Sequence, residues 1–114
     1  MNLIVQKPWG SYQILEKGKN YLVKNLLVKP GGTLSLQSHK HRSEHWVIVE
    51  GRAEVTINGN ITTLEPNQST YIPSETKHRL ANNYEKNLIL IEVWYGEILD
   101  EEDITRYEDI YNRV

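Results

Sequence analysis

Turn-forming residues recur at short intervals along the whole chain, and this feature limits what the chain can fold into more than any other. The segments between the turns are short and rich in Val, Ile, Leu, Thr and Tyr, a composition typical of β-strands. The sequence therefore predicts an all-β fold of many short strands, arranged as a sandwich or barrel. The turns are Pro8-Trp9-Gly10, Lys17-Gly18-Lys19-Asn20, Pro30-Gly31-Gly32, Glu50-Gly51, Asn58-Gly59-Asn60, Glu65-Pro66-Asn67, Pro73-Ser74 and Asn82-Asn83.

The clearest local signal is Asn58-Gly59, which lies between the segments 54–57 and 61–64. Glycine supplies the positive φ that a two-residue hairpin turn requires, so a tight hairpin is predicted here. The segments 21–29 and 87–94 are nearly continuous apolar runs. They predict interior strands that are covered on both faces.

The last part of the chain has a different pattern. Residues 100–103 are acidic, and apolar or aromatic residues follow at positions 104, 107, 110 and 111. This spacing predicts one or two helical turns with an apolar face, which would pack on the barrel or on a second subunit. We expect a single domain over residues 1–114, with the barrel at about 3–95 and a short C-terminal helical tail at about 96–114.

Composition excludes several classes of protein. The 114 residues include no cysteine, so disulfides and thiolate zinc sites are excluded and His, Glu and Asp remain as metal ligands. The 13 basic and 15 acidic residues give a net charge of −2 and form no basic stripe, so no nucleic acid partner is expected. No apolar run approaches the ~20 residues that span a bilayer, and the first residues lack a signal-peptide pattern. A cytoplasmic protein without membrane association is expected.

A histidine cluster is the main chemical signal, because residues 37–46 contain three of the four histidines. His39 and His41 alternate on a predicted strand, so their side chains would share one face. With Glu44 and His78 they provide three nitrogens and one carboxylate oxygen, which suit a divalent first-row cation with open coordination positions. Zinc is the first candidate, and Mn, Fe, Co and Ni accept the same donors. The simpler alternative is a solvated histidine edge without metal.

The spacing around this cluster resembles that of the cupin motifs. Only one of Glu44 and His45 can face the cavity, because neighbouring side chains on a strand point to opposite faces. Glu44 is the expected ligand, since its spacing to Gly51 matches the first cupin motif, and His78 follows Pro73 as in the second. His45 is then an outward-facing surface histidine or, alternatively, a catalytic proton carrier.

Two features depart from the pattern of cupins at large. The gap between His41 and Glu44 is two residues, so Glu44 would reach the metal around a tight turn. Glu75 stands where the second motif usually has glycine, and a side chain disfavours a positive-φ turn. The loop before His78 is therefore expected to be rebuilt.

Further polar residues are candidates for substrate binding. Gln37, two residues before the first ligand, can coordinate the metal, orient a ligand or simply line the cavity. The guanidinium groups of Arg42 and Arg79 suit bidentate phosphate binding. Alternatively, Arg42 forms a salt bridge with Glu44, and Arg79 points outward. Lys24 is a further candidate for binding phosphate, although a solvated lysine side chain is the more common arrangement.

Over almost its whole length the chain resembles the type II phosphomannose isomerase domain. That domain forms the C-terminal part of bifunctional mannose-1-phosphate guanylyltransferase/mannose-6-phosphate isomerase enzymes. The residues that carry the resemblance are Lys7-Pro8-Trp9-Gly10-Ser11-Tyr12, Val28-Lys29-Pro30-Gly31-Gly32, Leu34-Ser35-Leu36-Gln37, His39-Lys40-His41-Arg42-Ser43-Glu44-His45-Trp46, Glu65-Pro66-Asn67-Gln68-Ser69-Thr70-Tyr71-Ile72-Pro73, His78-Arg79-Leu80 and Ile91-Glu92-Val93.

The resemblance implies a cupin fold, which is a double-stranded β-helix or jelly-roll barrel, and a bound divalent metal. It also implies interconversion of mannose 6-phosphate and fructose 6-phosphate through an enediol, in the supply of GDP-mannose for polysaccharide synthesis. Glu44 and His45 are the candidate acids and bases, and Arg42 would help to hold the phosphorylated hexose. Nothing in the chain resembles the glycine-rich loop of the nucleotidyltransferase half, so guanylyl transfer is not expected from this chain alone.

Other functions stay open at this point. The chain could be a non-catalytic cupin that binds a sugar phosphate or nucleotide sugar, an accessory subunit of a separate mannose-1-phosphate guanylyltransferase, or an iron-dependent oxygenase. A homodimer is expected because several aromatic residues could form a subunit interface, although they could equally close the ends of the barrel. These residues are Trp9, Tyr12, Trp94, Tyr95, Tyr107 and Tyr111.

Overall fold

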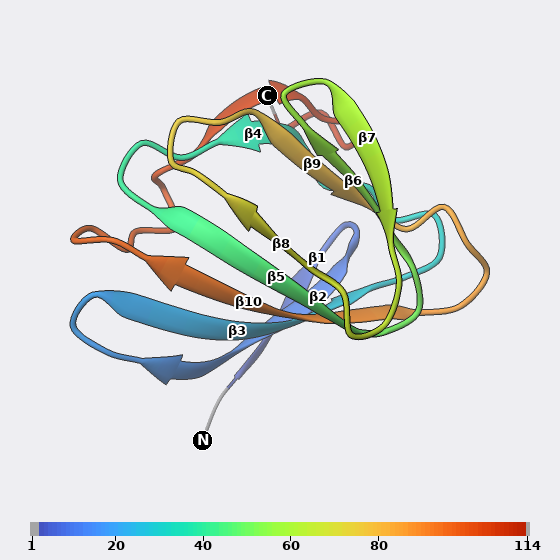
Figure 1. Ribbon diagram of the computed structural model, residues 1–114, viewed down its shortest axis with the longest axis horizontal. Coiled ribbons are helices and arrows are strands. Elements are labelled where there is room, and N and C mark those ends of the chain that lie inside the picture. The colour runs from blue at the N-terminus through green and yellow to red at the C-terminus, as the bar shows by residue number, and fades with distance from the viewer. Residues whose placement is uncertain (1–2, 114) are drawn as a thin grey trace.

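The computed structural model describes residues 3–113, and this part of the chain is an all-β sandwich without a helix. Figure 1 shows the strands stacked in two layers. The strands in chain order are β1 (Ile4–Lys7), β2 (Gly10–Lys17), β3 (Tyr21–Val28), β4 (Leu36–Ser38), β5 (Ser43–Glu50), β6 (Ala53–Ile57), β7 (Asn60–Leu64), β8 (Ser69–Ile72), β9 (His78–Ala81), β10 (Leu88–Tyr95) and β11 (Thr105–Glu108).

All strand pairs are antiparallel and belong to two sheets. One sheet has six strands in the order β1-β2-β3-β10-β5-β8, and the other has five in the order β11-β4-β9-β6-β7. The long strand β10 pairs with both β3 and β5, although these strands are far apart in the sequence. This crossing between distant segments is what closes the chain into a jelly roll.

The core lies between the two sheets and is built from alternate residues of the central strands. In β5 the side chains of Trp46 and Ile48 are buried, whereas Val47 and Val49 face outward and are 38% and 53% exposed. Burial of each large apolar side chain contributes roughly 1.5–3 kcal/mol to stability. The same alternation places Glu44, which belongs to the row of Trp46, on the inner face.

The predicted hairpin is confirmed. Asn58 and Gly59 join β6 to β7, with φ angles of 49° and 81°. Positive φ at both central residues is the geometry of a type I′ turn, whose twist matches that of the flanking strands.

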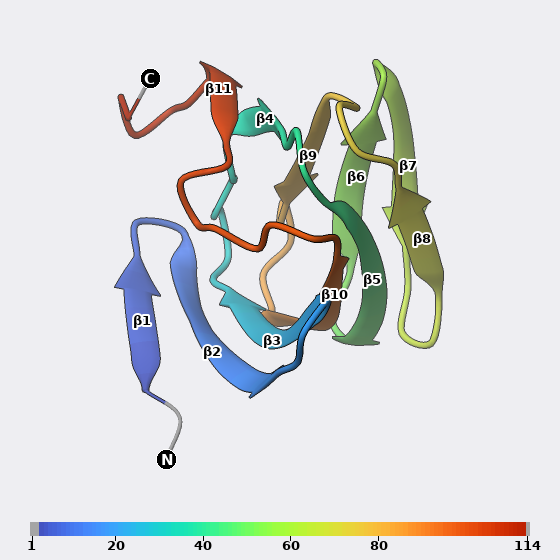
Figure 2. The same cartoon turned by 90° about the vertical axis from the view of Figure 1, so that its left-hand side faces the viewer.

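The predicted helical tail is wrong, because the tail continues the sheet instead. β11 pairs with the edge strand β4, and Figure 2 shows it beside β4 after a long segment that leads from β10. A free strand edge presents unpaired backbone N–H and C=O groups, and pairing with β11 satisfies them. Ile104 and Arg106 line the interior while Tyr107 is exposed. The tail therefore has the two-residue period of a strand.

The strands that were predicted to be covered on both faces are covered on one. In β10, Leu90 is fully buried, whereas Ile91 on the opposite face is only half-buried. Of the aromatic residues proposed for an interface, Trp9 and Trp94 are buried within the chain and Tyr95 is exposed. The homodimer, the cytoplasmic location and the single-domain boundaries stay predictions. Within residues 3–113 there is no helix long and apolar enough to cross a membrane.

Candidate metal centre

Three potential ligands from different parts of the sequence meet inside the sandwich. His39 directly follows β4, Glu44 lies in β5 and His78 begins β9. All three side chains are buried, and one donor atom of each lies within 4.8 Å of the others. Two imidazole nitrogens and a carboxylate oxygen at this separation form a possible binding site for a divalent metal.

Backbone carbonyls accept hydrogen bonds from the Nδ1 atoms of both histidines and so orient the two rings. The His39 Nδ1 lies 2.8 Å from the carbonyl oxygen of Asp103, and the His78 Nδ1 lies 2.8 Å from that of Thr76. Because a carbonyl only accepts hydrogen bonds, each Nδ1 carries a hydrogen, and the Nε2 of each ring is then the atom that a metal could bind. The Nε2 of His78 is buried and has no hydrogen-bond partner among the described residues. A metal ion would satisfy this atom.

The protonation states of the other donors also fit a cation. Burial opposes a charge on Glu44, but the hydrogen bond with His39 and the positive charge of Arg42 outweigh burial and hold the Glu44 pKa well below its usual range. Glu44 is therefore an anion at neutral pH. Burial is the main cause that lowers the pKa of His78, so its imidazole is neutral.

Gln37, and not His41, shares the interior with these ligands. Strand β4 ends at Ser38, and the chain then bends so that the backbone N–H groups of Lys40 and His41 donate to the Asp103 carboxylate, each at 2.9 Å. This bend leaves the side chain of His41 exposed and outside the ligand group. Gln37 is buried, is the register partner of His78 and lines an internal pocket together with His39 and Glu44. Gln37 therefore replaces His41 as the candidate for a fourth donor.

Two other predicted site residues lie away from the pocket. His45 is on the outer face of β5, where its ring packs 4.7 Å from that of Tyr71. Arg79 donates hydrogen bonds to the backbone carbonyls of Leu34 and Glu108, at 3.1 and 3.2 Å. Arg79 thus holds the tail against the sandwich, and the structure brings neither residue to the metal ligands.

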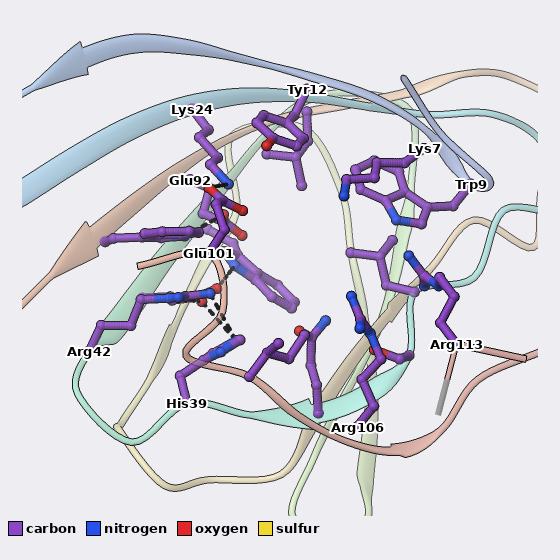
Figure 3. A pocket seen from close by; sticks show the side chains of 18 residues that line it. Lys7, Trp9, Tyr12, Lys24, His39, Arg42, Glu92, Glu101, Arg106 and Arg113 are labelled. Atoms are coloured by element: carbon purple, nitrogen blue, oxygen red, sulfur yellow. Dashed lines mark hydrogen bonds and ion pairs between the residues drawn. The ribbon is translucent and has the colours of Figure 1, made fainter. Parts of the chain in front are cut away.

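Arg42 and Lys24 do line the pocket, but both are already paired. The Nε of Arg42 donates to Glu44 at 2.9 Å, and the guanidinium lies 3.4 Å from the centroid of the Trp94 ring. The Nζ of Lys24 lies 2.7 Å from a carboxylate oxygen of Glu101. Figure 3 shows Arg42 and Lys24 on the same side of the pocket as His39.

Glu92 is a pocket residue that sequence reasoning missed. It is buried on the inner face of β10, and the indole Nε1 of Trp94 donates to it at 2.6 Å. Burial and the nearby charge of Glu44 raise the Glu92 pKa to about 8. A signal was present, because Glu92 is a single acid inside the apolar run 87–94. Such an acid on a central strand either faces solvent or serves a buried site.

The loop before His78 keeps the turn that Glu75 was expected to prevent. Glu75 adopts a φ of 61°, and its N–H donates to the carbonyl of His39 at 2.7 Å.

We expect Glu75→Gly to raise the free energy of unfolding by about 0.5–1 kcal/mol, because glycine has no side-chain penalty in this conformation. Urea denaturation would measure the change. Asn67→Gly, at a φ of 72°, is the control and should gain less, since asparagine tolerates positive φ. No gain for Glu75→Gly would contradict the argument.

Comparison with known proteins agrees with this geometry. Residues 1–109 match the family described as mannose-6-phosphate isomerase C-terminal. The chain belongs to this family. It is 51% identical over 112 residues to the alginate biosynthesis protein AlgA of Pseudomonas putida, covering 98% of this chain and 23% of that protein. It is 49% identical over 114 residues to the mannose-1-phosphate guanylyltransferase ManC of Salmonella typhimurium, covering 100% of this chain and 24% of that protein. The chain spans about a quarter of the length of these curated relatives.

Solved structures confirm the cupin fold of this family member. Oxalate decarboxylase from Bacillus subtilis matches with a TM-score of 0.81 and 21% identity, over 92% of this chain and 30% of that chain. A conserved protein from Klebsiella pneumoniae with a double-stranded β-helix domain matches with a TM-score of 0.77 and 17% identity, over 91% and 84% of the two chains. The family suggests a divalent metal, and the site contains a possible His/Glu ligand set for one.

Proposed function

We propose that this chain catalyses the metal-dependent interconversion of mannose 6-phosphate and fructose 6-phosphate. The observation that carries the proposal is the meeting, in one pocket, of a preorganised ligand set and a second buried carboxyl group. Glu44 belongs to the ligand set, and Glu92 lies within hydrogen-bonding reach of it. Family membership supports the choice of reaction.

Isomerisation of an aldose to a ketose removes a proton from the carbon beside a carbonyl and returns a proton to the neighbouring carbon. A bound divalent cation would supply electrophilic stabilisation of the oxygen on which negative charge develops. His39, Glu44 and His78 would hold the cation, with Gln37 as the fourth donor. Zinc is the first choice for this mixed nitrogen and oxygen set, and elemental analysis of the purified protein would identify the ion.

The proton carrier in this proposal is the Glu92 carboxyl group. It is not one of the metal ligands, its hydrogen bond from Trp94 fixes its orientation, and a pKa of about 8 lets it both hold and release a proton near neutral pH. This assignment replaces His45, which lies on the outer face, and it leaves Glu44 free to act as a ligand. Arg42 then orients Glu44 through their salt bridge.

A place in the supply of GDP-mannose is part of the proposal. The relatives named above are biosynthesis proteins and guanylyltransferases about four times as long as this chain, which matches a quarter of each. Their guanylyl transfer is not proposed for these residues. The rival function, binding of a sugar phosphate or nucleotide sugar without turnover, would use the same pocket.

Proton exchange separates the two functions. Protein incubated with fructose 6-phosphate in heavy water is expected to produce mannose 6-phosphate and to incorporate deuterium beside the carbonyl, as followed by NMR. A chelator should abolish both signals, and added divalent metal should restore them. Saturable binding of the hexose phosphate by the metal-loaded protein without product or deuterium would contradict the isomerase and support the binding protein.

A further inference from the structure

Lysine and arginine side chains surround the pocket, and some of them lack a counter-ion. Lys24 pairs with Glu101 at 2.7 Å, and Arg42 pairs with Glu44 at 2.9 Å. In contrast, Lys7 and Arg106 line the same pocket but form no ion pair with any of residues 3–113.

Arg106 is the clearest case of an unsatisfied cation. Its Nε is buried and has no hydrogen-bond partner among the described residues. A buried donor of a charged group that lacks a partner destabilises the folded protein, so a ligand that accepts its hydrogen bond is favoured. The position is imposed by the fold, because Arg106 is the register partner of Gln37 in the β4–β11 pair. The side chain therefore faces the ligand-lined interior and not solvent.

Arg113 completes the group. Its Nε and Nη2 donate to the two oxygens of the Asp109 carboxylate, at 2.6 and 3.2 Å, which fixes the guanidinium where it lines the pocket. Figure 3 shows the nitrogen ends of Lys7, Arg106 and Arg113 turned toward the same part of the pocket, on the side opposite His39 and Arg42. The pocket is thus divided into a metal end and a cationic end.

We propose that Lys7, Arg106 and Arg113 form the binding site for the phosphate group of a hexose phosphate, a proposal that rests on the isomerase function above. A phosphate monoester carries about −1.5 to −2 charges at pH 7, which matches the two cations that lack a counter-ion. Arginine guanidinium groups bind phosphate oxygens through paired N–H donors, so the phosphate would satisfy the Arg106 Nε. The sugar would then extend from the cationic end toward the metal ligands.

The assignment differs from the one made from sequence alone. Arg79 uses its guanidinium on backbone carbonyls, and Arg42 is committed to Glu44 and His39. The phosphate contacts come instead from the two ends of the chain: Lys7 ends β1, Arg106 lies in β11 and Arg113 follows it. Only the jelly-roll closure brings these distant segments together.

Phosphate affinity can be measured separately from turnover. Calorimetric titration of the metal-free protein with fructose 6-phosphate, and with fructose, reports binding at the cationic end alone. We expect Arg106→Gln and Lys7→Gln each to weaken fructose 6-phosphate binding at least about 10-fold, since each removes a charge-assisted contact. Arg52→Gln is the matched control, because Arg52 is exposed and pairs with Glu65 at 2.8 Å, away from the pocket. It should bind like the parent protein.

Turnover gives the second readout. In the metal-loaded protein both variants should raise KM for the hexose phosphate by a similar factor, with a smaller change in kcat. Arg106→Lys, which keeps the charge, should recover part of the affinity, and circular dichroism would verify the fold of each variant. Unchanged affinity in folded Arg106→Gln and Lys7→Gln would overturn the phosphate site even if the protein is an active isomerase. If both variants bind fructose 6-phosphate more weakly but the parent protein has no isomerase activity, the phosphate site would be supported and the proposed reaction would be contradicted.

Discussion

His39→Ala is expected to lose its bound divalent metal and its isomerase activity together while keeping the β-sandwich. The Nε2 of His39 is one of the three converging donors, and Asp103 orients its ring. Loss of a residue that hydrogen-bonds to a metal ligand typically lowers metal affinity 10–100-fold, so loss of the ligand itself should lower metal affinity at least about 100-fold. Metal content by elemental analysis and activity in the hexose phosphate assay would be measured on the same sample, with circular dichroism as the test of folding.

His41→Ala is the matched control for this experiment. It removes an imidazole two residues away, but the ring is exposed and outside the ligand group. The variant should keep its metal and its activity within about twofold. Metal-loaded, active His39→Ala would contradict the ligand assignment. Loss of metal in His41→Ala alone would show that sequence alternation, and not the bend after β4, identifies the ligand.

Glu92→Gln is expected to make the metal-free protein more stable at pH 7 and to abolish most of its activity. An acid whose pKa is raised on folding binds more protons in the folded than in the unfolded state, so the free energy of unfolding decreases as pH rises between the two pKa values. For Glu92 this interval runs from 4.5 to about 8. The neutral amide of the variant cannot ionise, so it avoids the loss of stability that ionisation of buried Glu92 causes, which is on the order of 1–3 kcal/mol at pH 7.

Urea denaturation at pH 5 and pH 8, with chelator present, would measure the stability difference between parent and variant. The difference should be small at pH 5 and should grow toward pH 8. Isomerase activity should decrease by about 10²–10⁴-fold, the usual contribution of a positioned acid or base. Glu65→Gln, at an exposed carboxyl outside the pocket, should leave activity unchanged. Full activity in Glu92→Gln would exclude Glu92 as the proton carrier.

Much of the fold could be predicted from local patterns. Alternation in residues 43–50 identifies which side chains of that strand are buried, and Asn58-Gly59 defines its hairpin. His39, Glu44 and His78 were recognisable because the spacing of motifs in a jelly roll is a property of the local chain. Each of these features depends on a few neighbouring residues, which is why it can be predicted from the sequence.

The rest depended on contacts between distant residues. His41 was expected beside His39. However, the carboxylate of Asp103, which is more than 60 positions further along the chain, holds the bend that turns the His41 side chain outward. The tail has apolar residues at helical spacing, yet the free edge of β4 draws it into a strand. The cationic end of the pocket depends on both events, so no local pattern in the sequence could locate it.

The segment after β10 has a consequence for how the protein would lose function. The loop that bears His39 is fixed by Asp103, and Asp100 accepts a hydrogen bond from Arg42, yet this segment adds little to the apolar core. Regions with few buried contacts open at lower free energy than the whole fold. If the segment that contains Asp100 and Asp103 detached, the His39 imidazole would lose its orientation while both sheets persisted. Loss of activity on warming should therefore precede global unfolding.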